Sequence, residues 1–321
     1  MLLDVRNLKL EFHTDDGVFK VLDGVCLEIQ KGKSMGLVGE TGCGKSVTGH
    51  AILGLIPKPA GKITGGEIIF QGVDLLRLPE REMRKIRGKK ISVIFQDPST
   101  SLNPAYTIGD QISEAISLHQ ENGGKAAAIE KTIQIMEMVG FPQAEQHLDD
   151  YPHQFSGGMR QRVIIAIALA CNPSLLIADE PTTALDVTIQ AQVLELIFEL
   201  SQKAGFSMLL ISHDLGIISQ MCDEISIMYA GYIVETTTME NFFANYKHPY
   251  SEGLIGSIPR LGHRKEMLNT IPGSVPSLID LPGGCRFHPR CSYTMDRCRI
   301  EKPLLREISL GHKVACFKVS G

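Results

Sequence analysis

The sequence lacks any hydrophobic run that approaches the roughly 20 consecutive apolar residues needed to cross a bilayer. Its longest candidate, residues 163–171, has the length of a buried helix instead. The N-terminal residues carry charges between their apolar side chains and show neither the long apolar core nor the cleavage site of a signal peptide. We therefore expect a protein of the cytosol, whose association with a membrane depends on partners.

The chain also lacks a strong excess of charge. Its 321 residues include 32 Lys and Arg against 36 Asp and Glu, for a formal net charge of -4 at pH 7. This balance provides no general attraction to nucleic acid or to anionic lipid, and no stripe of interleaved basic and aromatic residues is present. Hydrophobic residues make up 43% of the chain, which indicates a folded protein of one large domain or two smaller ones.

Residues 1–245 are predicted to form an α/β fold. Apolar and polar residues alternate up to residue 29, with a hairpin signal at Asp15-Asp16-Gly17, which predicts a small antiparallel β subdomain. Further strands are expected at residues 34–38, 67–70, 91–95, 175–178 and 208–211, with helices at 44–55, 159–171 and 188–203. Alternating strands and helices predict a mostly parallel sheet with helices on both faces.

Two segments depart from this pattern. Residues 98–160 place apolar side chains at helical spacing, including Ile108, Ile112, Ile129 and Ile133, and predict a helical insertion in the core. From residue 246 onward, prolines interrupt the chain repeatedly. We therefore expect a domain over residues 1–245 and a separate, loop-rich extension over residues 246–321.

A phosphate-binding motif occupies residues 39–46, Gly-Glu-Thr-Gly-Cys-Gly-Lys-Ser, which match the P-loop form GxxxxGK[ST]. The glycines let backbone N–H groups turn toward phosphates, Lys45 can reach the β- and γ-phosphates, and the Ser46 hydroxyl suits Mg²⁺. The motif lies between a predicted strand and a predicted helix, so a chance glycine-rich turn is disfavoured. The candidate nucleotide-binding residues are Gly39, Thr41, Gly42, Cys43, Gly44, Lys45 and Ser46.

Polar side chains at the ends of other predicted strands complete a candidate hydrolytic site. Asp179 can hold Mg²⁺, and Glu180 can polarise the water that attacks the γ-phosphate. Gln96 can contact both Mg²⁺ and that water, and His213 can touch the γ-phosphate. Taken alone, the two acidic residues are better explained as caps of a helix that starts near Pro181, and it is their pairing with the P-loop that favours hydrolysis. A single histidine at a strand end is more often an ordinary surface residue.

A second candidate anion site is Ser156-Gly157-Gly158, which opens a predicted helix with free N–H groups and a hydroxyl. The local sequence is explained equally well by a serine that caps the helix and two glycines that are merely flexible.

The order of these motifs, followed by Ala184-Leu185-Asp186 and Ser212-His213-Asp214, resembles the nucleotide-binding subunits of ABC transporters. The resemblance implies that residues 156–158 face the P-loop of a second subunit and that Asp186 contacts that subunit. It also implies an aromatic residue stacked on adenine, for which Phe12 is the first candidate and Phe19 the second, although either suits a plain core position. Phe155 and Met159 replace the commoner Leu and Gln, and neither alters the phosphate-contacting residues.

Longer segments are similar to the dipeptide and oligopeptide importer ATPases, namely residues 95–104, 151–162, 179–188, 248–250, 271–276 and 284–291. This resemblance implies a Mg²⁺-dependent ATPase at the cytoplasmic face of the membrane, peripheral to it. The implied partners are a second, commonly non-identical ATPase, two permeases and an extracytoplasmic solute-binding protein. The implied permease contact lies between core and insertion, near Gln96 and residues 97–106. Related proteins import nickel complexes or other small solutes, so the solute stays open.

Four of the eight cysteines cluster in the extension: Cys285, Cys291, Cys298 and Cys316. Four thiolates suit tetrahedral Zn²⁺ or an iron–sulfur cluster, and the spacing lacks the Cys-x2-Cys pairs of common zinc modules. The family resemblance favours a [4Fe–4S] cluster over zinc, and the nearby arginines can offset its charge. The alternative is four free thiols in a mobile tail.

Two other functions remain as alternatives to transport. A soluble ABC ATPase that acts on nucleic acid or ribosomes usually has two cassettes or long basic insertions, and this chain has neither. A catalytically silent regulatory cassette is disfavoured because Lys45, Gln96, Asp179, Glu180 and His213 are all present.

Overall fold

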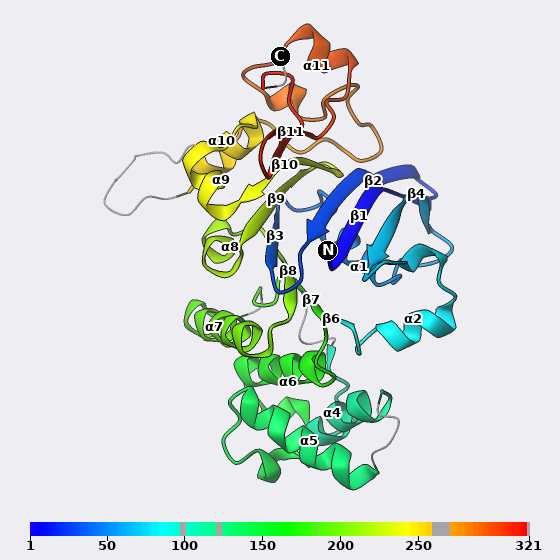
Figure 1. The fold of residues 1–321 in the computed structure, drawn as a ribbon, viewed down its shortest axis with the longest axis vertical. Helices are drawn as coiled ribbons and strands as arrows, with labels where there is room; N and C mark the ends of the chain where they lie inside the picture. The colour runs from blue at the N-terminus through cyan, green and yellow to red at the C-terminus, as the bar shows by residue number, and fades with distance from the viewer. Residues whose placement is uncertain (97–100, 120–123, 184, 259–269, 320–321) are drawn as a thin grey trace. The chain divides into compact units, whose positions relative to one another are not determined.

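The structure is a computed structural model that describes residues 1–96, 101–119, 124–183, 185–258 and 270–319. The chain forms two compact units, which are described separately below (Figure 1). Unit 1 comprises residues 1–29, 35–76 and 212–321, and unit 2 comprises residues 30–34 and 77–211.

The first sheet of unit 1 is antiparallel, with the strand order β2-β1-β4-β5. Its strands are β1 (Leu3–Thr14), β2 (Gly17–Ile29), β4 (Gly61–Phe70) and β5 (Val73–Asp74). The β1–β2 hairpin turns at Asp15 and Asp16, as the sequence predicted, with Thr14 opposite Gly17. The predicted antiparallel β subdomain is therefore present.

The remaining strands of unit 1 follow the order β11-β12-β10-β9-β3. Their bounds are β3 (Ser34–Val38), β9 (Glu224–Tyr229), β10 (Tyr232–Thr238), β11 (Arg306–Ser309) and β12 (His312–Val314). Strands β3 and β9 are parallel, and the pairs that follow β9 are antiparallel. Strand β12 pairs with β10, with Glu235 opposite Val314. The tail is therefore less separate than the sequence indicated, because its end adds a hairpin to the core sheet.

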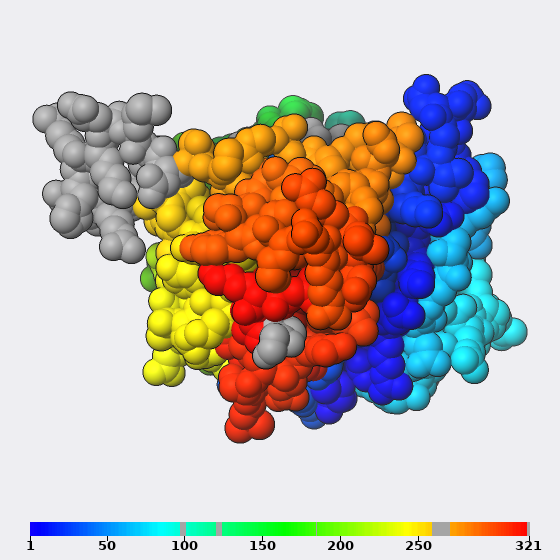
Figure 2. Space-filling view, turned by 90° about the horizontal axis from the view of Figure 1, so that it is seen from above, coloured from blue at the N-terminus to red at the C-terminus, as the bar shows by residue number. Residues whose placement is uncertain are grey.

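Helices of unit 1 surround these strands. They are α1 (Lys45–Ile52), α8 (Leu215–Met221), α9 (Met239–Asn245), α10 (Pro249–Gly256) and α11 (Asp296–Ile300). Figure 2 shows that residues 270–319, in orange and red, cover one face of unit 1 between the blue N-terminal strands and the yellow segment that includes α9 and α10.

Unit 2 contains the parallel strands β8-β7-β6. Their bounds are β6 (Ile91–Ile94), β7 (Leu175–Asp179) and β8 (Ser207–Ser212). Every residue of β7 and β8 is buried, which accounts for their nearly continuous apolar sequences. Gln96 and Glu180, which lie just after β6 and β7, are thereby brought to the same edge.

The helices of unit 2 are α2 (Glu80–Ile86), α4 (Ile108–Ser117), α5 (Lys125–Met138), α6 (Gly157–Leu169) and α7 (Val187–Ala204). Helices α4 and α5 form the predicted insertion, of which residues 98–100 and 120–123 lie outside the described part of the chain. Ile108 and Ile112 are buried as predicted, but Ile129 is 36% exposed. The buried face of α5 includes Thr132 instead, whose hydroxyl donates to the carbonyl of Ala128 at 2.8 Å. Among the residues that the structure describes, no helix is both long enough and apolar enough to span a membrane.

Candidate functional site

The P-loop connects β3 to α1 in unit 1, in the predicted position between a strand and a helix. Gly44 caps the helix with φ 107°, in the left-handed region that favours glycine. A Cβ on Gly39 would lie 2.1 Å from the carbonyl oxygen of Met228, so the close approach of β9 also requires glycine there. The backbone of the loop is thus held by both conformation and packing.

Lys45 is the first residue of α1 and its side chain turns back over the loop. Its Nζ donates to the carbonyl oxygens of Gly39 at 2.8 Å and Glu40 at 3.1 Å. The side chain is 5% exposed. Cys43 is fully buried, and burial raises the pKa of its thiol, so this cysteine is a packing residue of the loop. Thr41 and Gly42 are exposed, and Ser46 is half-buried in the first turn of the helix.

The two aromatic candidates for adenine stacking face each other across the β1–β2 hairpin. Phe12 and Phe19 are register partners, and each is half-buried. A Cβ on Gly61 of β4 would lie 3.0 Å from the ring of Phe12. The structure therefore places both candidates together, and the assignment of either to adenine remains a prediction.

In unit 2, the structure brings together two of the predicted hydrolytic residues. The Gln96 Nε2 donates to the Glu180 Oε2 at 3.0 Å. The hydroxyl of Thr183 donates to the same carboxylate oxygen at 3.0 Å. Glu180 has φ 45°, unusual for a residue other than glycine, and its N–H donates to the carbonyl of Ile211 at 2.9 Å. A strained backbone held by its neighbours is common at functional positions.

Asp179 and His213 end neighbouring strands of the chain. Asp179 is the last residue of β7 and is 3% exposed. His213 directly follows β8, belongs to unit 1 and is exposed. The next residue, Asp214, caps α8 by accepting from the N–H of Gly216 at 2.7 Å. His213 therefore lies at a fixed junction between strand and helix.

The Ser-Gly-Gly segment opens α6, with Ser156 as its N-cap. The hydroxyl of Ser156 accepts from the N–H of Met159 at 3.4 Å. Asp186 caps α7 by accepting from the N–H of Ile189 at 3.0 Å. A Cβ on Gly158 would lie 2.6 Å from the side chain of Ile189, so the two helix starts pack closely. Both predicted dimer-contact segments thus lie side by side in unit 2.

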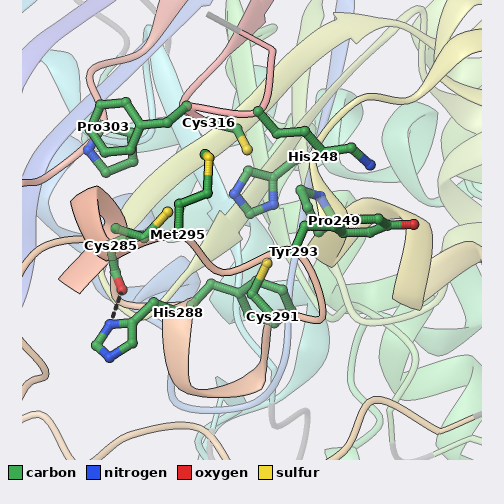
Figure 3. Close-up of a pocket in the computed structure, with 13 residues that line it drawn as sticks. His248, Pro249, Cys285, His288, Cys291, Tyr293, Met295, Pro303 and Cys316 are labelled. Carbon is green, nitrogen blue, oxygen red and sulfur yellow. Dashed lines mark hydrogen bonds between the residues drawn. The ribbon is translucent and has the colours of Figure 1, made fainter. Parts of the chain in front are cut away.

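The four clustered cysteines, Cys285, Cys291, Cys298 and Cys316, line one pocket. Its empty volume is about 330 Å³, including space open to solvent. Figure 3 shows His248 among the side chains of Cys285, Cys291 and Cys316. Burial lowers the pKa of His248 to about 3, and its Nδ1 accepts from the N–H of Tyr250 at 3.0 Å. No sequence signal distinguished His248 as a member of this pocket.

The predicted metal centre is not supported by the described residues. Among them, no group of three or more His, Cys, Asp or Glu side chains is arranged to hold a metal ion. Burial raises the pKa of the Cys316 thiol to about 11 and also raises the pKa values of Cys285 and Cys291. All four cysteine side chains nevertheless line one pocket.

The chain matches two family models in succession. The model described as ABC transporter covers residues 22–183, and the model described as Oligopeptide/dipeptide transporter, C-terminal region covers residues 234–298. The oligopeptide transport ATP-binding protein AppD of Bacillus subtilis is 50% identical over 98% of this chain and 96% of its own length. The dipeptide transport ATP-binding protein DppD of Escherichia coli is 46% identical over 98% of this chain and 96% of its own length.

A solved structure gives the same fold. The dimeric structure of MJ0796, a bacterial ABC transporter cassette, superimposes with a TM-score of 0.65 at 25% identity and covers 74% of this chain and 99% of its own. The P-loop, the strand-end carboxylates, the two family models and the relatives agree. The chain belongs to the ATP-binding subunits of ABC transporters, in the group that carries the oligopeptide/dipeptide transporter C-terminal region.

Proposed function

We propose that the chain hydrolyses ATP to drive the import of dipeptides or oligopeptides. The observation that carries this proposal is the presence of both family regions in one chain, an ABC transporter region followed by the oligopeptide/dipeptide C-terminal region. Relatives matched over 98% of the chain are named for oligopeptide and dipeptide transport. Nickel complexes and other small solutes remain the alternative cargo of the same mechanism.

The site residues divide the work of hydrolysis. Lys45 and the P-loop N–H groups bind the phosphates, and Ser46 and Asp179 are the residues that would hold Mg²⁺. When bound, Mg²⁺ supplies positive charge that neutralises the phosphate oxygens. Glu180 accepts a proton from the attacking water, and the bond from Gln96 orients its carboxylate. His213 is proposed to contact the γ-phosphate.

ATP binding is proposed to close a dimer of two such subunits. Residues 156–158 and Asp186 would contact the second subunit, and the packing of Gly158 against Ile189 supports their acting as one surface. Hydrolysis and phosphate loss would reopen the dimer. A related cassette, MJ0796, forms a dimer.

The remaining partners follow from the importer assignment. We propose a second ATPase, commonly non-identical, together with two permeases and a solute-binding protein, so that the chain is peripheral to the cytoplasmic face of the membrane. The permease contact is proposed near Gln96 and residues 97–106, of which 97–100 lie outside the described residues. We also retain the proposed division into a nucleotide-binding domain, 1–245, and an extension, 246–321.

Purification of the tagged chain from gently solubilised native membranes tests this function. Mass spectrometry is expected to identify two permeases, a second ATPase and a peptide-binding protein. A nickel-binding protein in place of the peptide-binding protein would mean that the transported solute is a nickel complex and that the transport mechanism is unchanged. Ribosomal or DNA-repair partners without a permease would overturn the transport function.

The four cysteines of the extension are proposed to hold a metal centre, a [4Fe–4S] cluster in preference to Zn²⁺. Their common pocket supports this, as does the choice of four sulfur donors. We infer a structural role for the centre, since the segment has little regular secondary structure of its own.

Metal analysis of the chain purified anaerobically is expected to give about four iron and four sulfide per chain. Cys291→Ser should lower that content, whereas Cys26→Ser, a half-buried cysteine of β2, should leave it unchanged. Stoichiometric zinc without iron would show that the four cysteines form a metal site but that its metal is Zn²⁺. A chain with neither metal, or equal losses in the two variants, would refute the site.

A further inference from the structure

The first variable residue of the P-loop, Glu40, is held by two residues of the C-terminal part of the chain. Its backbone N–H donates to the hydroxyl oxygen of Tyr250 at 3.0 Å. Its carboxylate oxygens accept from the Nη1 of Arg290 at 3.0 and 3.1 Å. These two residues lie 210 and 250 positions further along the chain. All three belong to unit 1.

The Arg290 side chain is held by several further contacts. Its side chain is 6% exposed, against 29% for Glu40. Its Nε donates to the carbonyl of Pro272 at 2.8 Å and its Nη2 to that of Ile271 at 3.3 Å. The guanidinium also lies 5.8 Å from the ring centroid of Tyr229 and donates to its hydroxyl at 3.4 Å. An arginine anchored in this way presents its charge at one place with little loss of side-chain entropy.

Arg290 lies next to the cysteine pocket in the chain. Arg290 ends the short turn His288–Arg290, which lies between Cys285 and Cys291. Within that turn, the N–H of Arg290 donates to the carbonyl of Phe287 at 3.0 Å. The Phe287 ring packs at 5.1 Å from Tyr229 and 5.4 Å from Tyr250. The cysteine segment and the P-loop thus share one rigid aromatic cluster.

The contact bears directly on phosphate binding. Lys45 donates to the carbonyls of Gly39 and Glu40, so the conformation of Glu40 and the position of the catalytic lysine are linked. A carboxylate at this point of the loop would also repel a triphosphate unless a cation neutralised it. We propose that Arg290 is a positioning residue for ATP binding, which holds Glu40 and neutralises its charge so that the P-loop is ready for phosphate.

The test is equilibrium binding of a non-hydrolysable ATP analogue with Mg²⁺ to the full chain. Arg290→Ala is expected to raise the Kd about tenfold, within the usual range of coupling between contacting sites. In steady-state hydrolysis, KM should rise by a similar factor, with kcat at saturating ATP changed by less than about twofold, since Arg290 acts on binding alone. Arg290→Lys should recover part of the affinity, because it keeps the charge and loses the fixed geometry.

Lys313→Ala provides the matched control. Lys313 also joins the C-terminal segment to an N-terminal strand by an ion pair, to Glu28 at 2.6 Å, but that pair does not involve the P-loop. Its Kd for the analogue should stay within about twofold of the original chain. An unchanged Kd in Arg290→Ala, or an equal rise in Lys313→Ala, would overturn the proposal.

Arg290→Lys, which keeps the buried charge, carries the test if Arg290→Ala folds poorly. A double-mutant cycle with Glu40→Gln tests whether Arg290 acts through Glu40. Glu40→Gln preserves side-chain volume and the backbone bond to Tyr250 while removing the negative charge. If Arg290 acts through Glu40, its removal should cost much less affinity in the Glu40→Gln background than in the original chain. Additive effects would refute the coupling. This inference rests on ATP binding by the P-loop and not on the peptide cargo, so a failure of the unaltered chain to bind the analogue would count against the proposed function instead.

Discussion

Glu180→Gln is expected to lower the rate of ATP hydrolysis by about two to four orders of magnitude, the usual contribution of a general base. An amide has no basic lone pair to accept the proton of the attacking water, yet it occupies the same volume. It can still accept from Thr183, which donates to this side chain at 3.0 Å. ATP should therefore still bind, and the variant should accumulate as an ATP-bound dimer.

Turnover is measured by phosphate release at saturating ATP, and dimer formation by size-exclusion chromatography with and without ATP. Glu199→Gln on α7 is a suitable control, because that exposed carboxylate pairs with Lys203 in the same helix. Its turnover should equal that of the original chain. Unchanged turnover in Glu180→Gln would remove Glu180 from its assigned role, and a loss of ATP binding would show that its role is structural.

Local sequence predicted the P-loop well, because the motif, the strand before it and the helix after it are contiguous. The hairpin at Asp15-Asp16-Gly17 was predicted for the same reason. Helix α5 was predicted correctly, but its buried face was predicted only in part. Thr132 is buried and Ile129 is exposed, since the hydroxyl of Thr132 is satisfied by the carbonyl of Ala128 and needs no water.

Contacts between distant residues could not be predicted. Strand β12 has three residues, too few for a recognisable alternation, and its pairing with β10 and β11 defines it. The contact of Arg290 with Glu40 joins residues 250 positions apart. The sequence indicated Arg290 only as one of several cations near the cysteines, and nothing local identified the P-loop as its partner.

Glu235→Ala is expected to lower the free energy of unfolding by about 3 kcal/mol, because it removes a buried carboxylate that accepts three hydrogen bonds. Glu235 is on β10 and is fully buried, as is His312 on β12. Its Oε1 accepts from the Nε2 of His312 and from the N–H of Lys247, each at 2.7 Å. Its Oε2 accepts from the N–H of His248 at 2.9 Å. Alanine would leave the buried donors of His312 and His248, and the partly buried N–H of Lys247, without this acceptor.

The exposed ion pair formed by Lys313, the residue after His312 in β12, tests whether the cost of losing Glu235 depends on its burial. Lys313 on β12 pairs with Glu28 on β2, with side chains 32% and 46% exposed. Glu28→Gln should therefore cost less than about 1 kcal/mol in urea unfolding, against about 3 kcal/mol for Glu235→Ala. Equal costs would mean that Glu235 does not join the extension to the core. A large difference would mean that Glu235 attaches β12 and the start of α10 to the core. Tyr250, which contacts the P-loop, lies in the first turn of that helix.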